Sequence, residues 1–333
     1  MADLTYSRAV DALVSAAIRS KKPALPNETL EGLHAAGTAL AGEPMPLAAA
    51  RRLRDAVGPD RCVFLLTGVY DPVALPFGET DGPPGVAIAA RALDIGLGAK
   101  PVVVCEEPLM GGIELTAVAA KLLPVRDAEH ARRKAHTVLL EPFPIASLED
   151  SAARARELFS RYEPAAVVAV ERLGWNSKRR YHYAGGAPLP RQGYVECLFE
   201  AAEAAGVLRV AVGDGGNEIG MGSIVERVRE VVPAGRRCHC DCLAGTACTV
   251  GADALVVANT SNLGAYGITA CLGLLLDRPD LVHDRATERR LLDAVAEAKC
   301  MDGGFVSPSV DGGEDSPLAI VELLHTVVDF ACR

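Results

Sequence analysis

The stretch from residue 208 to 222 decides the fold class, and it reads LRVAVGDGGNEIGMG. Its first five residues form a nearly continuous apolar run, which is typical of a strand buried on both faces of a parallel sheet. Five glycines follow between residues 213 and 222, and a pattern of helical period begins near residue 223. Strand, glycine-rich turn and helix together predict one βα unit of an open α/β sheet.

The same alternation continues on both sides of this stretch. Short apolar runs predict strands at 62–67, 101–105, 137–140, 166–170, 208–212 and 254–258. Stretches of helical period predict helices at 86–97, 113–121, 147–162, 192–205, 223–232, 264–276, 286–299 and 316–330. We therefore expect a doubly wound, mainly parallel sheet in a Rossmann-like three-layer α/β fold.

The first sixty-one residues have a different texture. Apolar residues recur with helical period at 9–18, 30–40 and 46–57, and prolines separate these runs. We expect a helical N-terminal extension over residues 1–61, followed by a single α/β domain over residues 62–333.

Composition narrows the function classes. The chain of 333 residues is 50% hydrophobic and has a formal net charge of −9, which argues against a nucleic-acid surface. No segment has the length and apolar character of a membrane span or a secretory signal, so we expect a cytoplasmic protein with no membrane partner. Its ten cysteines are then expected to be reduced thiols. We allow for a homo-oligomer.

Polar residues follow the predicted strands, at the edge where open parallel sheets bind ligands. After the first strand come Thr67 and Gly68 and then the turn 78–85, GETDGPPG, which carries Glu79 and Asp81. After the fourth strand comes the segment 171–174, ERLG. A helix cap is an equal alternative for the turn, and a surface ion pair is an alternative for the adjacent Glu171 and Arg172.

The glycine-rich loop 213–222 is the strongest local signal. Glycines let backbone N–H groups approach a ligand, while carboxylate and amide side chains offer oxygen ligands to a cation. The loop matches neither a P-loop nor a dinucleotide fingerprint, so no nucleotide cofactor is expected. A purely structural loop is the alternative. The polar segment 259–267, NTSNLGAYG, follows the sixth strand and can contact a substrate or cap the next helix.

A cysteine cluster at 238–242, CHCDC, with Cys248 beyond it, raises the question of zinc. The C-x-C-x-C spacing lacks a second ligand pair at a distance, so a turn of small residues is favoured over a zinc site. None of the seven histidines belongs to a recognisable nucleophile motif.

Taken in order, four of these motifs resemble the C-terminal domain of D-glutamate cyclase, over roughly residues 62–312. They are 79–85, ETDGPPG; 171–174, ERLG; 213–222, GDGGNEIGMG; and 261–266, SNLGAY. The segments at 302–304 and 310–312 look like the final loop of that family. The chain departs from the family in having Leu263 where tryptophan is usual, and residues 1–61 are too short for the hydro-lyase-like N-terminal domain of the eukaryotic cyclase.

The resemblance implies cyclisation of D-glutamate, or a related small carboxylated amino acid, to 5-oxo-D-proline with loss of water. Lactam closure needs a base, an acid, and a cation or hydrogen-bond donors. The residues then expected to be catalytic are Glu79, Asp81, Glu171, Arg172, Asp214 and Glu218. The residues expected to contact the substrate are Thr67, Gly68, Tyr181, Gly215, Gly216, Asn217, Ser261, Asn262 and Tyr266.

Arg172 would clamp a substrate carboxylate with its two parallel donors. Asp214, Glu218 and Asn217 are the candidate ligands for a divalent cation, Mg²⁺ or Mn²⁺. Two alternatives stay open: a metal-dependent lyase, isomerase or hydrolase of another small carboxylated metabolite, and a module that binds an amino acid without turnover.

Overall fold

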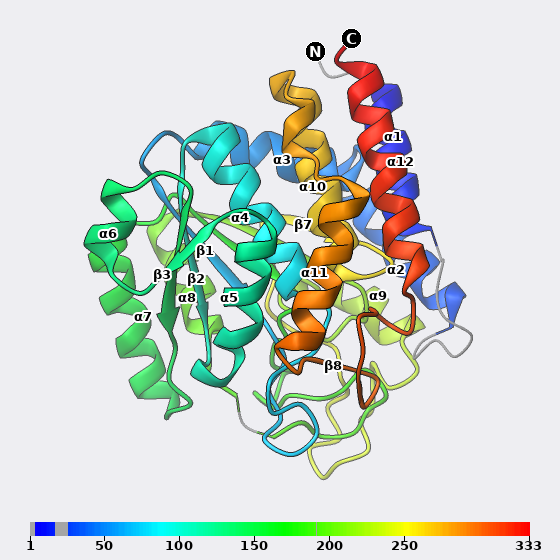
Figure 1. Ribbon diagram of the computed structural model, residues 1–333. Coiled ribbons are helices and arrows are strands. Elements are labelled where there is room, and N and C mark those ends of the chain that lie inside the picture. Colours follow the sequence, from blue (N-terminus) through cyan, green and yellow to red (C-terminus); the bar gives the residue numbers. More distant parts are fainter. Residues whose placement is uncertain (1–3, 17–25, 191) are drawn as a thin grey trace.

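A seven-stranded parallel sheet forms the centre of the molecule, as the computed structural model of residues 4–16, 26–190 and 192–333 shows (Figure 1). Its spatial order is β3-β4-β2-β1-β5-β6-β7. The strands are β1 (Cys62–Thr67), β2 (Lys100–Cys105), β3 (Leu123–Val125), β4 (Thr137–Pro142), β5 (Ala166–Val170), β6 (Leu208–Gly213) and β7 (Ala254–Val257). The predicted parallel α/β sheet is thus confirmed.

Helices cover both faces of the sheet, which makes three layers. The helices are α1 (Leu4–Ser15), α2 (Asn27–Ala41), α3 (Met45–Ala56), α4 (Pro83–Leu97), α5 (Met110–Ala119), α6 (Ala128–Arg133), α7 (Leu148–Tyr162), α8 (Glu196–Ala205), α9 (Val225–Val231), α10 (Ser261–Leu276), α11 (Arg285–Glu297) and α12 (Asp315–Ala331). Neighbouring helices α3, α10, α4 and α5 pack against one another over the sheet, and α8 packs on β5 and β6 beside α7.

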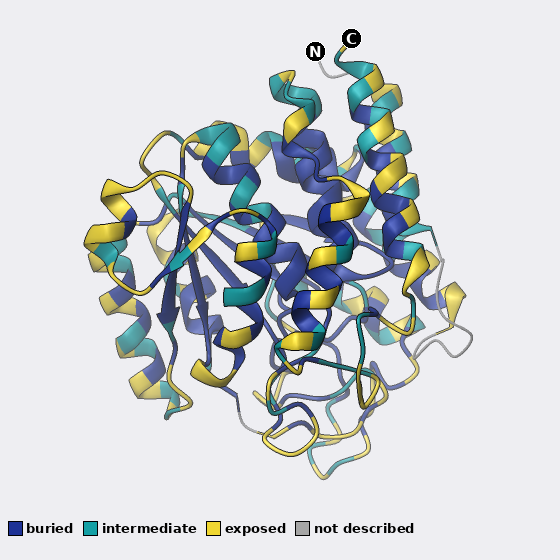
Figure 2. Cartoon of the chain, viewed as in Figure 1, coloured by how far each residue is buried: buried dark blue, intermediate teal, exposed yellow. Residues whose placement is uncertain are grey.

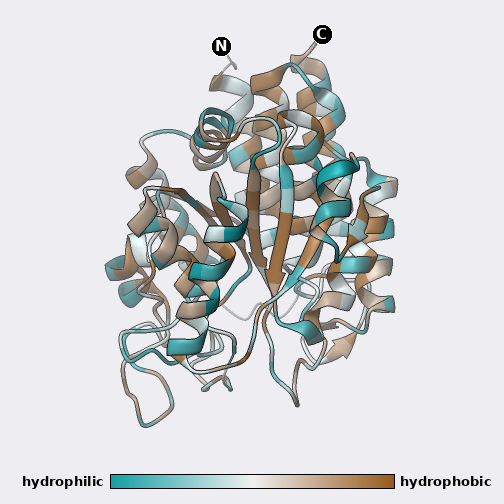
Figure 3. Ribbon diagram, turned by 90° about the vertical axis from the view of Figure 1, so that its left-hand side faces the viewer, coloured by the Kyte–Doolittle hydropathy of each residue, from teal (hydrophilic) through white to brown (hydrophobic). Residues whose placement is uncertain are grey.

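The strands form because their residues are apolar on both faces. The sheet is the most buried part of the molecule (Figure 2) and its strands are strongly hydrophobic (Figure 3). Phe64 in β1, for example, is fully buried and makes an edge contact with Phe159 of α7, with ring centroids 5.6 Å apart. Burial of such aromatic side chains contributes several kcal/mol each to the folded state.

The predicted elements agree with the structure within a few residues at most boundaries. Three short elements were missed: β3, α6 and the two-stranded hairpin of β8 (Met301–Asp302) and β9 (Phe305–Val306). β3 lies at the sheet edge and has only three residues, one of them Pro124, so its apolar pattern is too short to recognise.

The first three helices have the predicted helical character, although residues 17 and 18 of the first predicted helix lie outside the described ranges. They share the main hydrophobic core through residues such as Val10, Leu33 and Leu53. α1 packs against α10 and α12, and both α2 and α3 pack against β7. None of the helices in the described ranges is long and apolar enough to cross a membrane.

Candidate active site

Three carboxylates meet where the strand order reverses. β1 connects toward β2 on one side, whereas β5 pairs with β1 on the other, so the switch point of the sheet lies between β1 and β5. Asp81 follows β1, Glu171 follows β5 and Asp214 follows β6, and one carboxylate oxygen from each lies within 4.8 Å of the others. We call these three residues the acidic triad. Ligands of open α/β sheets bind at such a point.

Asp81 is held by the helix on the far side of the switch point. Its carboxylate accepts hydrogen bonds from the backbone N–H groups of Ser261 and Asn262, both at 2.8 Å, at the start of α10. In return, the Asn262 side-chain oxygen accepts from the N–H groups of Gly82 (2.9 Å) and Gly85 (2.7 Å) at the start of α4. Each helix is therefore capped by a residue of the other, and the two loops are locked together.

Glu171 occupies a strained position between these loops. Its φ is 45°, in the left-handed region that non-glycine residues seldom adopt. The Ser261 hydroxyl donates to its carboxylate at 2.5 Å. Gly82, with φ of 106°, lets the turn before α4 approach this position, because a Cβ there would lie 3.2 Å from the Cβ of Glu171 and 2.4 Å from the Thr67 hydroxyl. The strain at Glu171 is typical of a functional site.

The glycine-rich loop folds around one of its own side chains. The Glu218 carboxylate accepts from the N–H groups of Gly215 (2.7 Å) and Gly216 (2.8 Å). The Asn217 amide donates to the backbone oxygen of His182 at 2.9 Å. Of the three residues predicted as cation ligands, only Asp214 belongs to the acidic triad. Glu218 and Asn217 instead form these hydrogen bonds with backbone groups.

Burial and mutual repulsion disfavour ionisation of the site. Burial, and then the charge of Asp214, hold the pKa of Glu171 well above its usual value. Burial and the charges of Asp81 and Asp311 do the same for the pKa of Glu79. Burial and Asp311 raise the pKa of Asp81 to about 7, even though backbone N–H groups oppose the shift. Within the described ranges, no Lys or Arg forms an ion pair with Glu79, Asp81 or Glu171.

The late acidic loop lies against the same site. The backbone of Met301 exchanges hydrogen bonds with the turn after β1, to Thr80 (3.1 Å) and Gly78 (3.0 Å). This pairing brings the loop 302–312 close enough for Asp311 to act on Glu79 and Asp81. Sequence reasoning noted these segments only through the family resemblance, and it assigned them no site residue.

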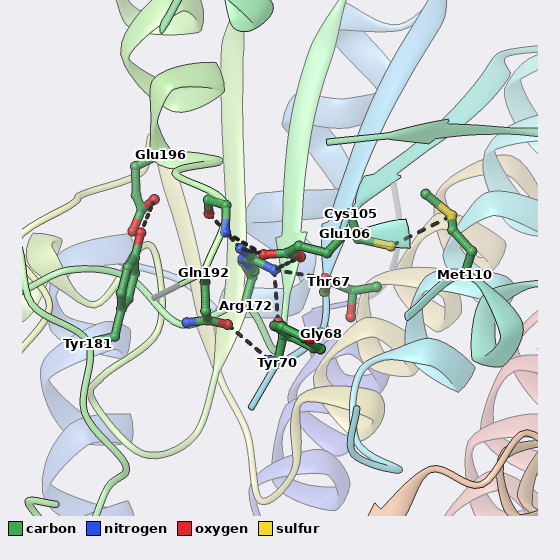
Figure 4. Close-up of polar contacts among 11 residues, drawn as sticks. Thr67, Gly68, Tyr70, Cys105, Glu106, Met110, Arg172, Tyr181, Gln192 and Glu196 are labelled. Atoms are coloured by element: carbon green, nitrogen blue, oxygen red, sulfur yellow. Dashed lines mark hydrogen bonds and ion pairs between the residues drawn. The ribbon is translucent and has the colours of Figure 1, made fainter. Parts of the chain in front are cut away.

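Arg172 points into a separate network, which Figure 4 shows. Its guanidinium donates to both oxygens of Glu106, at 2.6 and 2.7 Å, and also to the backbone oxygens of Gly68 (3.1 Å) and Gly193 (2.8 Å). Both charged side chains are 0% exposed. A substrate carboxylate would have to displace Glu106 to be clamped there. Glu106 directly follows β2, so the strand-end rule that identified the acidic loops could have found it.

The two predicted tyrosines also lie in other surroundings. Tyr181 donates to Glu196 at 2.8 Å, beside the Arg172 network (Figure 4). Tyr266 is buried in α10, and its ring packs edge-on against that of His283, with ring centroids 4.5 Å apart. Thr67 and Gly68 contribute backbone oxygens to Arg172. Of the predicted substrate contacts, Ser261 and Asn262 are those joined directly to the acidic triad by the hydrogen bonds described above.

The acidic triad has the chemistry of a divalent-cation site. Carboxylate oxygens are the ligands that Mg²⁺ and Mn²⁺ prefer. Buried carboxylates that repel one another are stabilised in their charged form by a cation. Glu79 adds a buried side-chain oxygen that has no hydrogen-bond partner within the described ranges. The residues present therefore fit such an ion.

A cavity elsewhere in the molecule does not compete with this assignment. It lies at the opposite edge of the sheet and is lined by residues that begin strands, such as Cys62, Lys100 and Thr137. It contains none of the acidic triad. The carboxyl ends of the strands carry the strained and electrostatically perturbed residues, so we place the candidate site there.

Fold and site together define a three-layer α/β protein with a carboxylate-rich site at the switch point of its sheet. The chain belongs to the family described as D-glutamate cyclase-like, C-terminal, which matches residues 28–319. The sequence-based identification of the family is thus confirmed.

A curated relative carries the same family name. The human protein D-glutamate cyclase, mitochondrial, is 30% identical to this chain over 206 residues. The match covers 59% of this chain and 30% of the human protein. The matched region thus spans less than a third of the length of that relative.

Proposed function

We propose that the chain cyclises D-glutamate, or a closely related amino acid, to 5-oxo-D-proline with loss of water, in the cytoplasm. The acidic triad at the switch point is the observation that carries the proposal. Family membership and the name of the human relative support the reaction class, a carbon–oxygen lyase. The substrate is a small carboxylated amino acid.

Asp81, Glu171 and Asp214 would hold a divalent cation, Mg²⁺ or Mn²⁺. Such a cation supplies positive charge that polarises a carboxyl group and offsets the charge of an anionic substrate. The chain's own contribution is to keep the three carboxylates in position. Asp81 is fixed by α10, and Glu171 by Ser261, so the ligand geometry exists before the substrate arrives.

Lactam closure moves protons as well as heavy atoms. The substrate nitrogen bonds to the side-chain carboxyl carbon, one C–O bond breaks, and water departs. Starting from an ammonium and a carboxylate, two protons leave the nitrogen and two arrive on the departing oxygen, so the reaction is balanced without a co-reactant. A carboxyl group that is protonated near neutral pH can deliver one proton and recover another.

Glu79 suits this proton-transfer role. Burial and neighbouring carboxylates raise its pKa well above the usual range, so the protonated form of Glu79 is favoured. Its Oε1 is buried and without a hydrogen-bond partner in the described part of the chain, and it lies on the loop that also carries Asp81. A raised pKa is the property by which a buried carboxyl group can serve as a general acid.

Arg172 then acts as a positioning residue. It ties the ends of β1 and β5 to Glu106 after β2, and these strand ends lead into the loops that carry Asp81 and Glu171. Clamping of a substrate carboxylate by Arg172 remains a prediction, and it would require Glu106 to move.

The test is a direct assay of the purified chain. Chelator-treated protein would be incubated with D-glutamate, with and without added Mg²⁺ or Mn²⁺, and 5-oxoproline would be measured by chiral chromatography with mass detection. We expect product from the D isomer only after a cation is added back, with loss of the primary amine in equal amount. L-Glutamate serves as the stereochemical control.

Three outcomes would change the assignment. Full activity without any cation would make the carboxylates metal-free acid and base groups. Calorimetric binding of D-glutamate without product would favour the amino-acid-binding module. Turnover of a different carboxylated metabolite, with D-glutamate inert, would favour the other lyase, isomerase or hydrolase.

A further inference from the structure

A second cluster of metal-ligating side chains lies outside the acidic triad. Cys238, Cys240 and Cys242 come from the loop after α9, and His182 comes from the long segment after β5. One ligand atom from each lies within 4.8 Å of the others. We call these four residues the thiol cluster. The sequence analysis favoured a turn of small residues because a second ligand pair at a distance was lacking. The structure instead brings in a single distant ligand, His182, from 56 residues upstream of Cys238.

Cys248, which the sequence placed with this cluster, has other surroundings. Its thiol accepts from the N–H of Val250 at 3.3 Å and lies against the backbone of Gly174. It is buried and is not one of the four grouped residues. The cluster therefore has three sulfur atoms and one imidazole nitrogen.

The distances within the cluster are close to those of a tetrahedron. The three sulfur–sulfur distances are 3.3, 3.4 and 3.5 Å. His182 Nε2 lies 3.2 Å from the sulfur of Cys240 and 3.6 Å from that of Cys242. Zinc–ligand bonds of about 2.0–2.3 Å in a tetrahedron give edges of about 3.5–3.8 Å. An outward movement of about 0.2 Å per ligand would therefore admit the ion.

The same distances argue against disulfide bonds, because sulfur atoms in a disulfide are about 2.05 Å apart. The ligand types also select the metal. Thiolates and imidazole favour Zn²⁺, whereas Mg²⁺ and Mn²⁺ prefer oxygen. Four protein ligands leave no open position, which is typical of a structural rather than a catalytic zinc site.

The surroundings of the cluster are those of a built site. Cys238 is 3% exposed and His182 is 1% exposed, whereas the other two cysteines are half-buried. The Asn176 amide donates to the sulfur of Cys242 at 3.5 Å and to the backbone oxygen of Gly245 at 2.7 Å. Such outer donors orient and stabilise metal-bound thiolates.

The cluster joins two irregular segments that flank the glycine-rich loop. The His182 backbone oxygen holds the side chain of Asn217, and the N–H of Cys248 donates to the backbone oxygen of Gly216 at 3.1 Å. The segment 232–253 contains no helix or strand. A long loop without regular structure needs another source of order, and a metal that links it to a second loop provides one.

We propose that His182, Cys238, Cys240 and Cys242 bind one structural Zn²⁺. The ion fastens the segment after β5 to the loop after α9 and thereby supports the glycine-rich loop beside the acidic triad. This site is independent of the proposed reaction and of the cation proposed for the acidic triad.

The first experiment measures the metal in the untagged chain, purified without chelator from zinc-supplemented cells. We expect about one zinc per chain by elemental mass spectrometry. The X-ray absorption spectrum should indicate three sulfur ligands and one nitrogen ligand. Cys240→Ser should lower the zinc content by about tenfold, whereas Cys332→Ser, at another half-buried thiol, should leave it unchanged. Asp214→Asn should also keep the zinc, which separates this site from the acidic triad.

A second experiment does not depend on variants that fold. Wild-type protein would be stripped of zinc under reducing conditions and titrated with Co²⁺. Thiolate-to-cobalt absorption bands that Zn²⁺ abolishes, and that excess Mg²⁺ leaves unchanged, would support the site. Failure of the folded, reduced chain to bind either ion would overturn the proposal, and so would an oxygen-only ligand shell or a disulfide between two of the three cysteines in protein purified anaerobically.

Discussion

The acidic triad and the thiol cluster both adjoin the glycine-rich loop, which contributes Asp214 to the triad and bonds to the backbone of His182, yet they are built in opposite ways. The acidic triad takes Glu171 and Asp214 from the ends of β5 and β6, and Asp81 from the turn that leads from β1 into α4, all at the carboxyl edge of the parallel sheet. The thiol cluster takes its residues from two irregular segments that the sheet does not position. The first is organised by the fold, whereas the second, with the zinc that we propose, would organise the loops that form it. Removing a ligand should therefore affect chemistry in the first case and order in the second.

The largest expected effect is a loss of turnover when a residue of the acidic triad is changed. Glu171→Gln and Asp214→Asn each remove one carboxyl group, a candidate cation ligand, from the acidic triad, and we expect turnover to fall by about 10²–10⁴-fold. Glu149→Gln, the same chemical change at an exposed position of α7, should leave turnover unchanged. The measurement is the initial rate of 5-oxoproline formation with zinc content determined in parallel. If a triad variant kept the wild-type rate of 5-oxoproline formation, the acidic triad would have no part in the mechanism.

The buried ion pair beside the acidic triad should give the largest loss of stability. Glu106→Gln leaves the Arg172 guanidinium, which is 0% exposed, without its counter-charge, and such a change costs about 3–5 kcal/mol. Arg172→Lys should also destabilise the chain, because an ammonium cannot reproduce the two parallel hydrogen bonds. Urea unfolding measures both effects. If Arg172→Lys instead kept full stability and raised the KM for D-glutamate, the guanidinium would contact substrate after all.

The stability of the cation-free protein should depend on pH, and a bound cation should change that dependence. The pKa of Asp81 is raised from 3.8 to about 7 in the folded chain, so its contribution to stability is present below pH 4 and is lost as the pH rises through 7. The pKa values of Glu79 and Glu171 are raised as well, and they act in the same direction.

We therefore expect the melting temperature of the cation-free protein to fall between pH 5 and 8. Added Mg²⁺ or Mn²⁺ should raise the melting temperature most at pH 8, because binding requires the charged carboxylates. Glu171→Gln should flatten the fall and weaken the response to the cation. Melting curves that are independent of pH in the cation-free protein would contradict the electrostatic account.

The smallest effect concerns the reciprocal caps of α4 and α10. Asn262→Ala removes the oxygen that accepts from Gly82 and Gly85, and we expect a loss of about 1–2 kcal/mol in unfolding free energy. Thr260→Ala removes the single cap bond to the N–H of Leu263 and should cost about 1 kcal/mol. If the two losses were equal, the link between the helices would add nothing beyond an ordinary cap.

The comparison also explains what the sequence could predict. A buried parallel strand has a clear apolar signature, so six of the seven strands of the main sheet and most helices were recognised. The strand-end rule then placed Glu79, Asp81, Glu171 and Asp214 at one edge, because the position of a strand end follows from topology alone. β3 was missed because three residues at an edge carry too little pattern.

Contacts between irregular segments were beyond this reasoning. His182 belongs to the thiol cluster only because the segment after β5 folds back onto the loop after α9. The sequence around position 182 contains no pattern that predicts this contact. The partners of Arg172 and Glu218 were missed for a related reason. A charged side chain in a motif can serve a ligand or the chain itself, and only its neighbours decide between the two. The assigned roles of these residues stay predictions until the variants are made.

The exchange of caps between α4 and α10 has a thermodynamic consequence for recognition. Because Asp81 and Asn262 already hold both loops, little backbone should remain to be ordered when a substrate enters. Association should then have a small heat-capacity change, and its free energy should depend mainly on charge and desolvation. A calorimetric titration of the cation-loaded chain over a range of temperatures would show an association enthalpy that is nearly flat, as expected for a rigid receptor.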